Sequence, residues 1–356
     1  MKVLTVIGGL SMGGAEHMAY ELIKNLDRNS FSPKLFCYGE RQNNSLENSV
    51  EKVCPVEFLN CSGHISIRKI LKVMRFISAE KPDLLHAHMG AVVFAIPWGI
   101  LHKKPVVVTV HTKPEQAFSK KNESLVKYGL RRGVVYLVAV SEDNCKKVQS
   151  YFHVDSSRCT FINNGIDTGR FYRKKHGEFT YINVARQDEN KNQTMLLNAF
   201  KIVHDLDTDT KLYLIGDGPC HNQLLRMRNE LGLDDCVEIP GNVDDPENYY
   251  ALSDVYVQTS HREAMPLSIL EAMAAGLPII STDVGGIKDV VDTNGFLIAD
   301  GDKEALINRM REMLLMPESE NKQMADRSFS IVDDYSSSKM ALRYETLYKR
   351  VAGQKG

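Results

Sequence analysis

Short and almost unbroken apolar runs alternate along this chain with stretches in which apolar residues recur every three or four positions. Such runs are typical of parallel strands that are covered on both faces, and the stretches between them are typical of amphipathic helices. The order of the two patterns predicts repeated strand–helix–strand units, and therefore an α/β fold. The predicted strands are Val3–Ile7, Lys34–Tyr38, Leu84–His88, Val106–Val110, Tyr136–Val140, Thr180–Ala185, Lys211–Ile215, Cys236–Ile239, Val255–Gln258, Ile279–Ser281 and Phe296–Ile298.

The series of strands restarts once, after the polar and basic stretch Arg170–Glu178. A chain of 356 residues suits two domains of ordinary size. We predict two doubly wound, Rossmann-like parallel-sheet domains, 1–172 and 173–335, with a cleft between the carboxyl ends of their strands, where such folds bind ligands. Segment 336–356 should form a final helix that packs back on the first domain, because one face of Ser336–Val351 is apolar.

A glycine-rich turn, Gly8–Glu16, follows the first strand and opens a helix. A dinucleotide fingerprint needs a second glycine at the position of Leu10, so the sequence disfavours a nicotinamide-dependent oxidoreductase. Bare backbone at Gly13 and Gly14 can nevertheless approach a ligand, and a helix N-terminus offers N–H groups to an anion. A plain tight turn remains the alternative.

The segment His261–Asp289 holds two glutamates eight positions apart, Glu263 and Glu271. Pro266 suits the first position of a helix and Gly276 the position after its end, so we predict a helix from about Pro266 to Ala275. Its free N–H groups can bind phosphate. Glu271 can hold a ribose diol, as acidic residues do in dinucleotide folds. An ordinary capped helix with one solvated glutamate is the alternative.

Composition narrows the class of protein and its compartment. The chain is 43% hydrophobic and 25% charged, which is the balance of a soluble globular protein. The seven cysteines show no CxxC spacing, and the N-terminal apolar stretch predicts a first strand in place of a signal peptide. The longest apolar run, Ala91–Leu101, is 11 residues long, too short to span a bilayer. We expect a cytoplasmic protein.

Charge is divided unevenly between the two halves of the chain. Residues 1–172 hold 23 Lys and Arg against 15 Asp and Glu, and the remainder holds 21 against 30. The first half also contains a basic amphipathic pattern, in which an apolar stripe, Ile67, Ile70, Leu71, Met74 and Ile77, runs beside Arg68, Lys69, Lys72 and Arg75. One interpretation is a core helix with a solvated basic face. The other is peripheral contact with the anionic inner face of the plasma membrane.

Two sequence patterns contain residues that can bind a metal, but neither is placed or completed as a metal site requires. Asp205–Asp207 and Asp207–Asp209 match DxD, but they lie in a polar loop at the amino end of a predicted strand, away from the cleft. His86 and His88 end a strand without a third ligand in view. We therefore predict no metal and no cofactor.

Several short motifs, in this order, match a known family. They are GGLSMGGAE near the start, PDLLHAH (82–88), TVHT (109–112), AVSE (139–142), INNGID (162–167), Arg186 with Lys191, LIGDGP (214–219) and EAMPLSILEAMAAGLPII (263–280). Together they make the chain resemble the retaining family 4 glycosyltransferases (glycosyl transferases group 1) of GT-B fold, over nearly its whole length.

The resemblance implies roles for individual residues. Arg186 and Lys191 would grip the donor diphosphate and neutralise the charge on the leaving group. Glu263 would contact hydroxyls of the donor sugar, Glu271 would bind the ribose, and His111 would lie near the reacting carbon. Backbone of Ala264, Met265, Leu267 and Ser268 would surround the sugar and phosphate. Gly13 and Gly14 would close over the diphosphate, and Gly216, Asn242 and Val243 would line the base.

The activity implied by the resemblance is sugar transfer from a nucleoside-diphosphate sugar, with uridine as the expected nucleoside, and with retention of anomeric configuration. The acceptor would be an oligosaccharide or lipid-linked glycan of a bacterial surface polysaccharide, such as a capsule or exopolysaccharide, and no nucleic acid partner is expected. Two alternatives stay open. A nucleotide-sugar epimerase of the same fold would need further acid–base carboxylates. A non-catalytic subunit of a glycosyltransferase complex should have lost residues such as Lys191 or Glu271, which are present.

Overall fold

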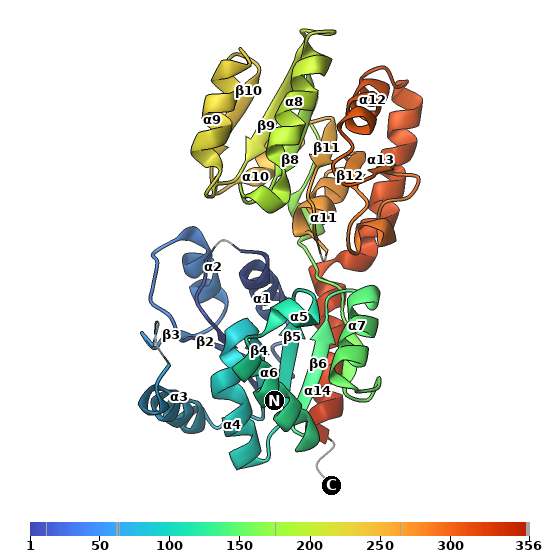
Figure 1. Ribbon diagram of the computed structural model, residues 1–356. Coiled ribbons are helices and arrows are strands. Elements are labelled where there is room, and N and C mark those ends of the chain that lie inside the picture. Colours follow the sequence, from blue (N-terminus) through green and yellow to red (C-terminus); the bar gives the residue numbers. More distant parts are fainter. Residues whose placement is uncertain (12, 62, 64, 175, 264, 354–356) are drawn as a thin grey trace. The chain divides into compact units, whose positions relative to one another are not determined.

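The computed structural model describes residues 1–11, 13–61, 63, 65–174, 176–263 and 265–353 (Figure 1). The chain divides into two compact units. The first unit is Met1–Gly165 together with the C-terminal segment from Ser337, and the second is Ile166–Ser336. The chain thus passes between the units at Gly165, whereas the sequence-based boundary was set after residue 172. The polar stretch Arg170–Glu178 lies inside the second unit.

A seven-stranded parallel sheet forms the centre of the first unit, with strand order β3-β2-β1-β4-β5-β6-β7. The order reverses between β1 and β4, which makes their carboxyl ends a switch point of the kind where such sheets bind ligands. The strands are β1 (Lys2–Ile7), β2 (Ser32–Cys37), β3 (Val56–Phe58), β4 (Leu84–His88), β5 (Val106–Val110), β6 (Val135–Ala139) and β7 (Cys159–Phe161).

Helices cover both faces of this sheet because alternate residues of each strand point to opposite faces. Leu4 and Val6 pack with α3, α4, α6 and α7 on one face. Val3 packs with α1 and α14 on the other. The helices of the unit are α1 (Gly14–Asn25), α2 (Ser45–Val53), α3 (Ile67–Glu80), α4 (Val92–His102), α5 (Pro114–Ala117), α6 (Lys120–Arg131), α7 (Glu142–Phe152) and α14 (Ser337–Gly353), with the single turn η1 (Met89–Ala91).

The C-terminal helix α14 is part of the first unit (Figure 1). Its apolar face, which includes Met340, Tyr344, Leu347 and Val351, is buried against α1 and the sheet. Tyr344 also reaches the core polar groups, since its hydroxyl lies 3.0 Å from Oγ1 of Thr109 on β5. The last helix therefore completes the core of the domain in which the chain begins.

The second unit has a six-stranded parallel sheet of order β10-β9-β8-β11-β12-β13. Helices α8, α9 and α12 pack on one face, and α10, α11 and α13 on the other. Its elements are β8 (Phe179–Val184), α8 (Gln193–His204), β9 (Thr210–Ile215), α9 (His221–Glu230), β10 (Val237–Gly241), α10 (Pro246–Ala251), β11 (Val255–Gln258), α11 (Leu267–Ala274), β12 (Ile279–Thr282), β13 (Gly295–Ile298), α12 (Lys303–Leu314) and α13 (Glu318–Val332), with the single turns η2 (Thr168–Arg170), η3 (Glu189–Lys191), η4 (Ile287–Asp289) and η5 (Asp333–Tyr335).

Close backbone crossings hold together the loops that follow β8 and β9. Gly216 has φ +122°, and a Cβ atom there would lie 2.1 Å from the carbonyl oxygen of Ala185. Gly218 is equally constrained, because a Cβ atom would lie 2.3 Å from the oxygen of Gln187. Only glycine fits such positions without displacing the neighbouring loop. These crossings fix the carboxyl edge of the second sheet.

The helix predicted from about Pro266 to Ala275 is α11, which begins one residue later. The ψ of Pro266, 130°, places this residue outside the helix as its N-cap. Proline's fixed φ, here −73°, suits both positions, so the sequence pattern could not separate them. Among the described residues, no helix has the length and apolar character needed to cross a membrane.

Candidate active site

The loops that follow the neighbouring strands β8 and β11 are tied to each other at the carboxyl edge of the second sheet. The Thr259 hydroxyl donates to the carbonyl oxygens of Lys191 and Asn192, at 2.9 and 3.0 Å. The His261 amide donates to the oxygen of Asn190 at 2.7 Å. The side chains carried by the two loops are therefore held in a fixed relation.

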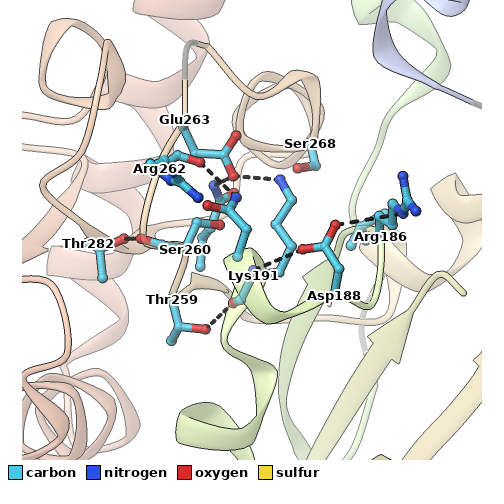
Figure 2. A network of polar contacts seen from close by, with 12 residues as sticks. Arg186, Asp188, Lys191, Thr259, Ser260, Arg262, Glu263, Ser268 and Thr282 are labelled. Carbon is cyan, nitrogen blue, oxygen red and sulfur yellow. Dashed lines mark hydrogen bonds and ion pairs between the residues drawn. The ribbon is translucent and has the colours of Figure 1, made fainter. Parts of the chain in front are cut away.

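An ion pair joins these loops. The Lys191 ammonium contacts Oε1 of Glu263 (Figure 2), and the two atoms are 2.5 Å apart. Only 19% of the Lys191 side chain and 10% of the Glu263 side chain are exposed. Asp188 holds the backbone of Lys191 by accepting from its amide. Sequence reasoning proposed both residues as ligands of the donor, and the structure brings them into contact.

A hydrogen-bonded chain continues from Glu263 to the first turn of α11. The side-chain nitrogen of Gln258, Nε2, donates to Oε1 of Glu263 at 2.9 Å, and the Tyr256 hydroxyl donates to Oε1 of Gln258 at 2.8 Å. The oxygens of Tyr256 and Ser268 are 2.7 Å apart. Since the single Tyr256 proton goes to Gln258, Ser268 donates to Tyr256 and keeps its own lone pairs free.

Glu271 lies one turn further along α11. The Tyr250 hydroxyl contacts both Oε2 of Glu271, at 3.0 Å, and the carbonyl oxygen of Ser268, at 3.1 Å. Burial raises the pKa of Glu271 above its usual value, while the hydrogen bond from Tyr250 and the charge of Arg170 oppose that rise. A desolvated carboxylate with few partners is suited to accept hydrogen bonds from a ligand diol.

The N-terminus of α11 carries no side-chain cap, so within the described residues the first-turn amides, including those of Leu267 and Ser268, have no capping acceptor. Met265 packs into the core beneath, and Leu267 lies at its margin. Ala264, which was predicted as a ligand, lies outside the described residues. The uncapped N-terminus of α11 lies next to the hydrogen-bonded side chains that run from Glu263 to Ser268. This part of the sheet edge is therefore suited to an anionic ligand.

Arg186 follows β8, as Lys191 does, but the structure does not bring its side chain into this cluster. Its side chain is 69% exposed, and its Nε lies 3.6 Å from Oδ2 of Asp188. In Figure 2, Arg186 lies beside Asp188, apart from the Lys191–Glu263 pair. The loop after β8 therefore supplies two cations. Lys191 is held beside Glu263, whereas the Arg186 side chain faces solvent.

The residues predicted to line the base follow the adjacent strands β9 and β10. The Gly216 amide donates to the oxygen of Gly241 at 2.9 Å, which joins the two strand ends. Asn242 is exposed, and Val243 packs at the margin of the core. The loops after β8, β9, β10 and β11 thus share one edge of the sheet.

The predicted residues of the first unit lie at the carboxyl edge of its own sheet. Gly13 is the N-cap of α1, where a Cβ atom would lie 2.5 Å from a carboxylate oxygen of Glu16, and Gly14 begins the helix. His111 follows β5, and its Nε2 lies 3.0 Å from Nδ1 of His88 at the end of β4. Burial lowers the pKa of His111 to about 4, so its ring is neutral at neutral pH.

Neither pattern considered as metal ligands forms part of a group that could hold a metal ion among the described residues. Asp205, Asp207 and Asp209 are exposed in the turn between α8 and the amino end of β9. Within the described part of the chain, no group of three or more His, Cys, Asp or Glu side chains could hold a metal ion. Both buried histidines of the HxH pattern instead contact other side chains, His86 through Tyr348 and Thr109.

Sequence reasoning missed the residues that support the candidate ligands. Tyr256 and Gln258 are buried side chains of β11, and Tyr250 comes from α10. The one available signal was a glutamine at the end of an apolar strand, directly before the loop that carries Glu263. Arg170, which pairs with Glu247 at 2.7 Å near Glu271, gave no signal at all.

Two family models match the chain, and together they span residues 12 to 328. Residues 12–170 match the model of Glycosyltransferase Family 4, and residues 168–328 match that of Glycosyl transferases group 1. Curated relatives agree. The chain is 27% identical over 302 residues to N-acetyl-alpha-D-glucosaminyl L-malate synthase from Bacillus anthracis, covering 78% of this chain and 77% of the relative.

A second relative is UDP-Gal:alpha-D-GlcNAc-diphosphoundecaprenol alpha-1,3-galactosyltransferase from Escherichia coli. It is 24% identical over 325 residues, which cover 84% of each chain.

Solved structures show the same fold. The crystal structure of Anabaena Alr3699/HepE in complex with UDP superposes with a TM-score of 0.82, at 21% identity, over 98% of this chain and 99% of that one. A glycosyltransferase from Rickettsia africae superposes with a TM-score of 0.82, at 19% identity, over 100% and 99% of the two chains. The sheet orders, the family models and these neighbours agree: this chain is an enzyme that belongs to the family 4, group 1 glycosyltransferases, and it has the GT-B fold.

Proposed function

We propose that the enzyme takes a sugar from a UDP-sugar, binds that donor at the carboxyl edge of the second sheet, and transfers the sugar with retention of configuration. The observation that carries the donor assignment is the buried contact between Lys191 and Glu263 beside the uncapped N-terminus of α11. A buried cation and free helix N–H groups are complementary to a diphosphate. The Anabaena structural neighbour was crystallised with UDP.

Each predicted donor ligand then has a physical task. Lys191, with Arg186 turned inward from solvent, neutralises the charge that develops on the departing diphosphate. Glu263 accepts hydrogen bonds from sugar hydroxyls, and Glu271 accepts those of the ribose. The first-turn backbone amides, including those of Leu267 and Ser268, face the phosphates, and Gly216, Asn242 and Val243 border the uracil.

We propose that the first unit contributes Gly13, Gly14 and His111 to donor contacts, with His111 at the sugar. The bond between the anomeric carbon and the diphosphate oxygen breaks, a bond from the acceptor oxygen forms on the same face, and the acceptor proton passes to the leaving phosphate. No metal enters this scheme, because the protein cations supply the charge. The anomeric coupling constant in the ¹H NMR spectrum of the product tests retention.

UDP is expected to raise the melting temperature of the full-length enzyme by several degrees. A ligand that binds only the folded state at 100 times its Kd adds about 2.7 kcal/mol of stability. UMP, which lacks one phosphate to contact Lys191, should give a smaller rise at the same concentration. Differential scanning fluorimetry measures both, with ADP and GDP as controls for the base. An equal rise with ADP, or none with UDP, would remove the UDP assignment.

We further propose that the acceptor is a lipid-linked glycan of bacterial surface-polysaccharide synthesis, and that the enzyme works in the cytoplasm at the inner face of the membrane. The name of the Escherichia coli relative specifies an acceptor on diphosphoundecaprenol. A second support comes from α3. Its predicted apolar stripe divides, because Ile77 is buried whereas Ile67 is 76% exposed and Leu71 52% exposed.

The exposed side of α3 combines apolar and basic side chains. A hollow of about 330 Å³ is lined by Arg68, Leu71, Lys72, Arg75 and Phe76. Residues 65–79 contain no Asp or Glu. Such a face suits the head-group layer of an anionic bilayer, into which apolar side chains insert between basic ones.

Replacing Lys72 and Arg75 by alanine is expected to weaken binding to anionic vesicles roughly 30-fold, since each basic residue near such a surface contributes about 1 kcal/mol. Sedimentation with vesicles of equal parts phosphatidylcholine and phosphatidylglycerol measures the partition. The matched control is Lys120→Ala with Lys121→Ala, which removes the same charge from exposed positions on α6 of the same unit. If the unaltered protein shows no preference for anionic over pure phosphatidylcholine vesicles, the membrane proposal fails.

A further inference from the structure

Three histidine rings lie side by side at the carboxyl ends of β4 and β5. The ring centroids of His86 and His88 are 4.3 Å apart, and those of His88 and His111 are 5.2 Å apart. His86 and His88 are fully buried, and His111 is the member of the row that is partly exposed. The row therefore runs from the core to the edge of the sheet where ligands bind in such folds.

Each ring of the row is neutral and carries one proton. Burial lowers the pKa of His86 to about 3 and that of His111 to about 4, and it holds the pKa of His88 well below the usual value. His86 has partners for both nitrogens, since the Tyr348 hydroxyl lies 2.7 Å from Nδ1 and Oγ1 of Thr109 lies 2.7 Å from Nε2. Whichever nitrogen of His86 carries the proton, a hydroxyl oxygen of Tyr348 or Thr109 can accept it.

His88 is different, because only one of its nitrogens is engaged. Its Nδ1 lies 3.0 Å from Nε2 of His111, whereas its own Nε2 is buried without a hydrogen-bond partner in the part of the chain that the structure describes. Exactly one proton can occupy the contact between the two rings. Either His88 donates from Nδ1, or His111 donates from Nε2 and the proton of His88 sits on its orphaned Nε2.

The two arrangements do not cost the same. A buried N–H group without an acceptor is rarer in proteins than a buried acceptor with an unused lone pair. With the proton of His88 on Nδ1, its N–H group donates to His111, and the unpartnered Nε2 carries only an unused lone pair. This arrangement forces Nε2 of His111 to accept, and so it places the proton of His111 on Nδ1.

We infer that His88 is a positioning residue that fixes His111 as the Nδ1–H tautomer, so that His111 presents a hydrogen-bond donor to its ligand. Asn144 supports this placement, because its side-chain amide donates to the carbonyl oxygen of Thr112 at 3.1 Å and so holds the backbone beyond His111. The inference rests on the proposed function for its ligand. On that function, the atom facing Nδ1 of His111 is an oxygen of the donor sugar that accepts a hydrogen bond.

The tautomer can be measured without any ligand, by long-range ¹H–¹⁵N NMR on the full-length protein labelled at histidine. We expect Nδ1 of His111 at the frequency of a protonated nitrogen and Nε2 at that of a bare one, with His111→Gln used to assign the signals. The reverse pattern in the unaltered protein overturns the inference. Because no nucleotide is present, this result is independent of whether UDP is the donor.

Two amide substitutions of His88 separate tautomer control from simple packing. In His88→Asn the side-chain nitrogen replaces Nδ1 and can still donate to His111, whereas in His88→Gln it falls near the place of Nε2. We expect His88→Asn to keep the His111 pattern and His88→Gln to move the protonated-nitrogen signal away from Nδ1. A His88→Gln spectrum identical to that of the unaltered protein contradicts the inference. Melting temperatures confirm that both variants are folded, and His88→Leu replaces His88→Gln if the latter is not.

Discussion

Lys191→Met is expected to lower kcat/KM for sugar transfer by about 10²- to 10³-fold while the protein stays folded. Removing one preorganised group that stabilises charge in a transition state costs this much in well-studied enzymes. Lys191 is held in place by Glu263 at 2.5 Å and by the loop contacts of its backbone, so in the proposed donor site it would meet the leaving diphosphate without reorganising. Methionine keeps most of the apolar stem and removes only the charge. Release of UDP from the donor in the presence of acceptor measures the effect.

The matched control is Lys211→Met in the same unit. Lys211 also pairs with a glutamate, Glu178, at 2.5 Å, but it lies in β9 near the amino end of the strand, away from the edge that carries Lys191. Its loss should change kcat/KM by less than about threefold, because exposed ion pairs contribute little. Circular dichroism and melting curves show whether either variant is misfolded. Equal activity of the two variants would refute the role given to Lys191.

The central strands could be predicted because burial on both faces leaves an uninterrupted apolar run. β4, β5 and β11 begin and end where the sequence placed them. The two strands that were missed, β3 and β7, have three residues each and lie at the edges of the first sheet. Glu57 and Thr160 interrupt their apolar pattern, so pairing with the neighbouring strand decides their conformation, and that pairing is invisible in a short window of sequence.

The sequence could predict which residues of the candidate site lie at strand ends. It could not predict the direction in which each side chain extends. Lys191 and Glu263 come from loops after adjacent strands, and the fold brings them together. Arg186 also follows β8, but its side chain extends into solvent toward Asp188. The hydrogen bonds from Gln258 and Tyr250 depend on the register between elements distant in sequence. A strand position gives the edge of the sheet, and only packing gives the rotamer.

Glu271→Gln is expected to stabilise the unliganded protein and to weaken its binding of UDP. Burial raises the pKa of Glu271, so near neutral pH the folded protein carries a carboxylate that would be better solvated in the unfolded chain. Between the unfolded and folded pKa values the folded state binds more protons, and stability therefore falls as the pH rises through that window. Glutamine removes this loss and can still accept the hydrogen bond from Tyr250.

Melting curves recorded from mildly acidic to neutral pH measure the stability effect. The unaltered protein should lose more stability over this range than Glu271→Gln does. Glu312→Gln is the control, because Glu312 lies on the exposed side of α12 and pairs there with Arg309. If Glu271→Gln melts below the unaltered protein at neutral pH, the carboxylate is satisfied by the protein alone and the ligand role loses its physical basis.

The binding loss should be confined to ligands that carry the ribose diol. A hydrogen bond to a charged group contributes about 1.5–3 kcal/mol, so Glu271→Gln should weaken UDP binding by about 10- to 150-fold in calorimetry. 2′,3′-Dideoxy-UDP lacks the hydroxyls that Glu271 would accept from, and it should bind the variant and the unaltered protein with nearly equal Kd. The four affinities form a double-mutant cycle whose coupling isolates the contact between Glu271 and the diol. If the substitution weakens both nucleotides by the same factor, Glu271 acts through the shape of α11, because a general distortion of that helix would not distinguish the two sugars.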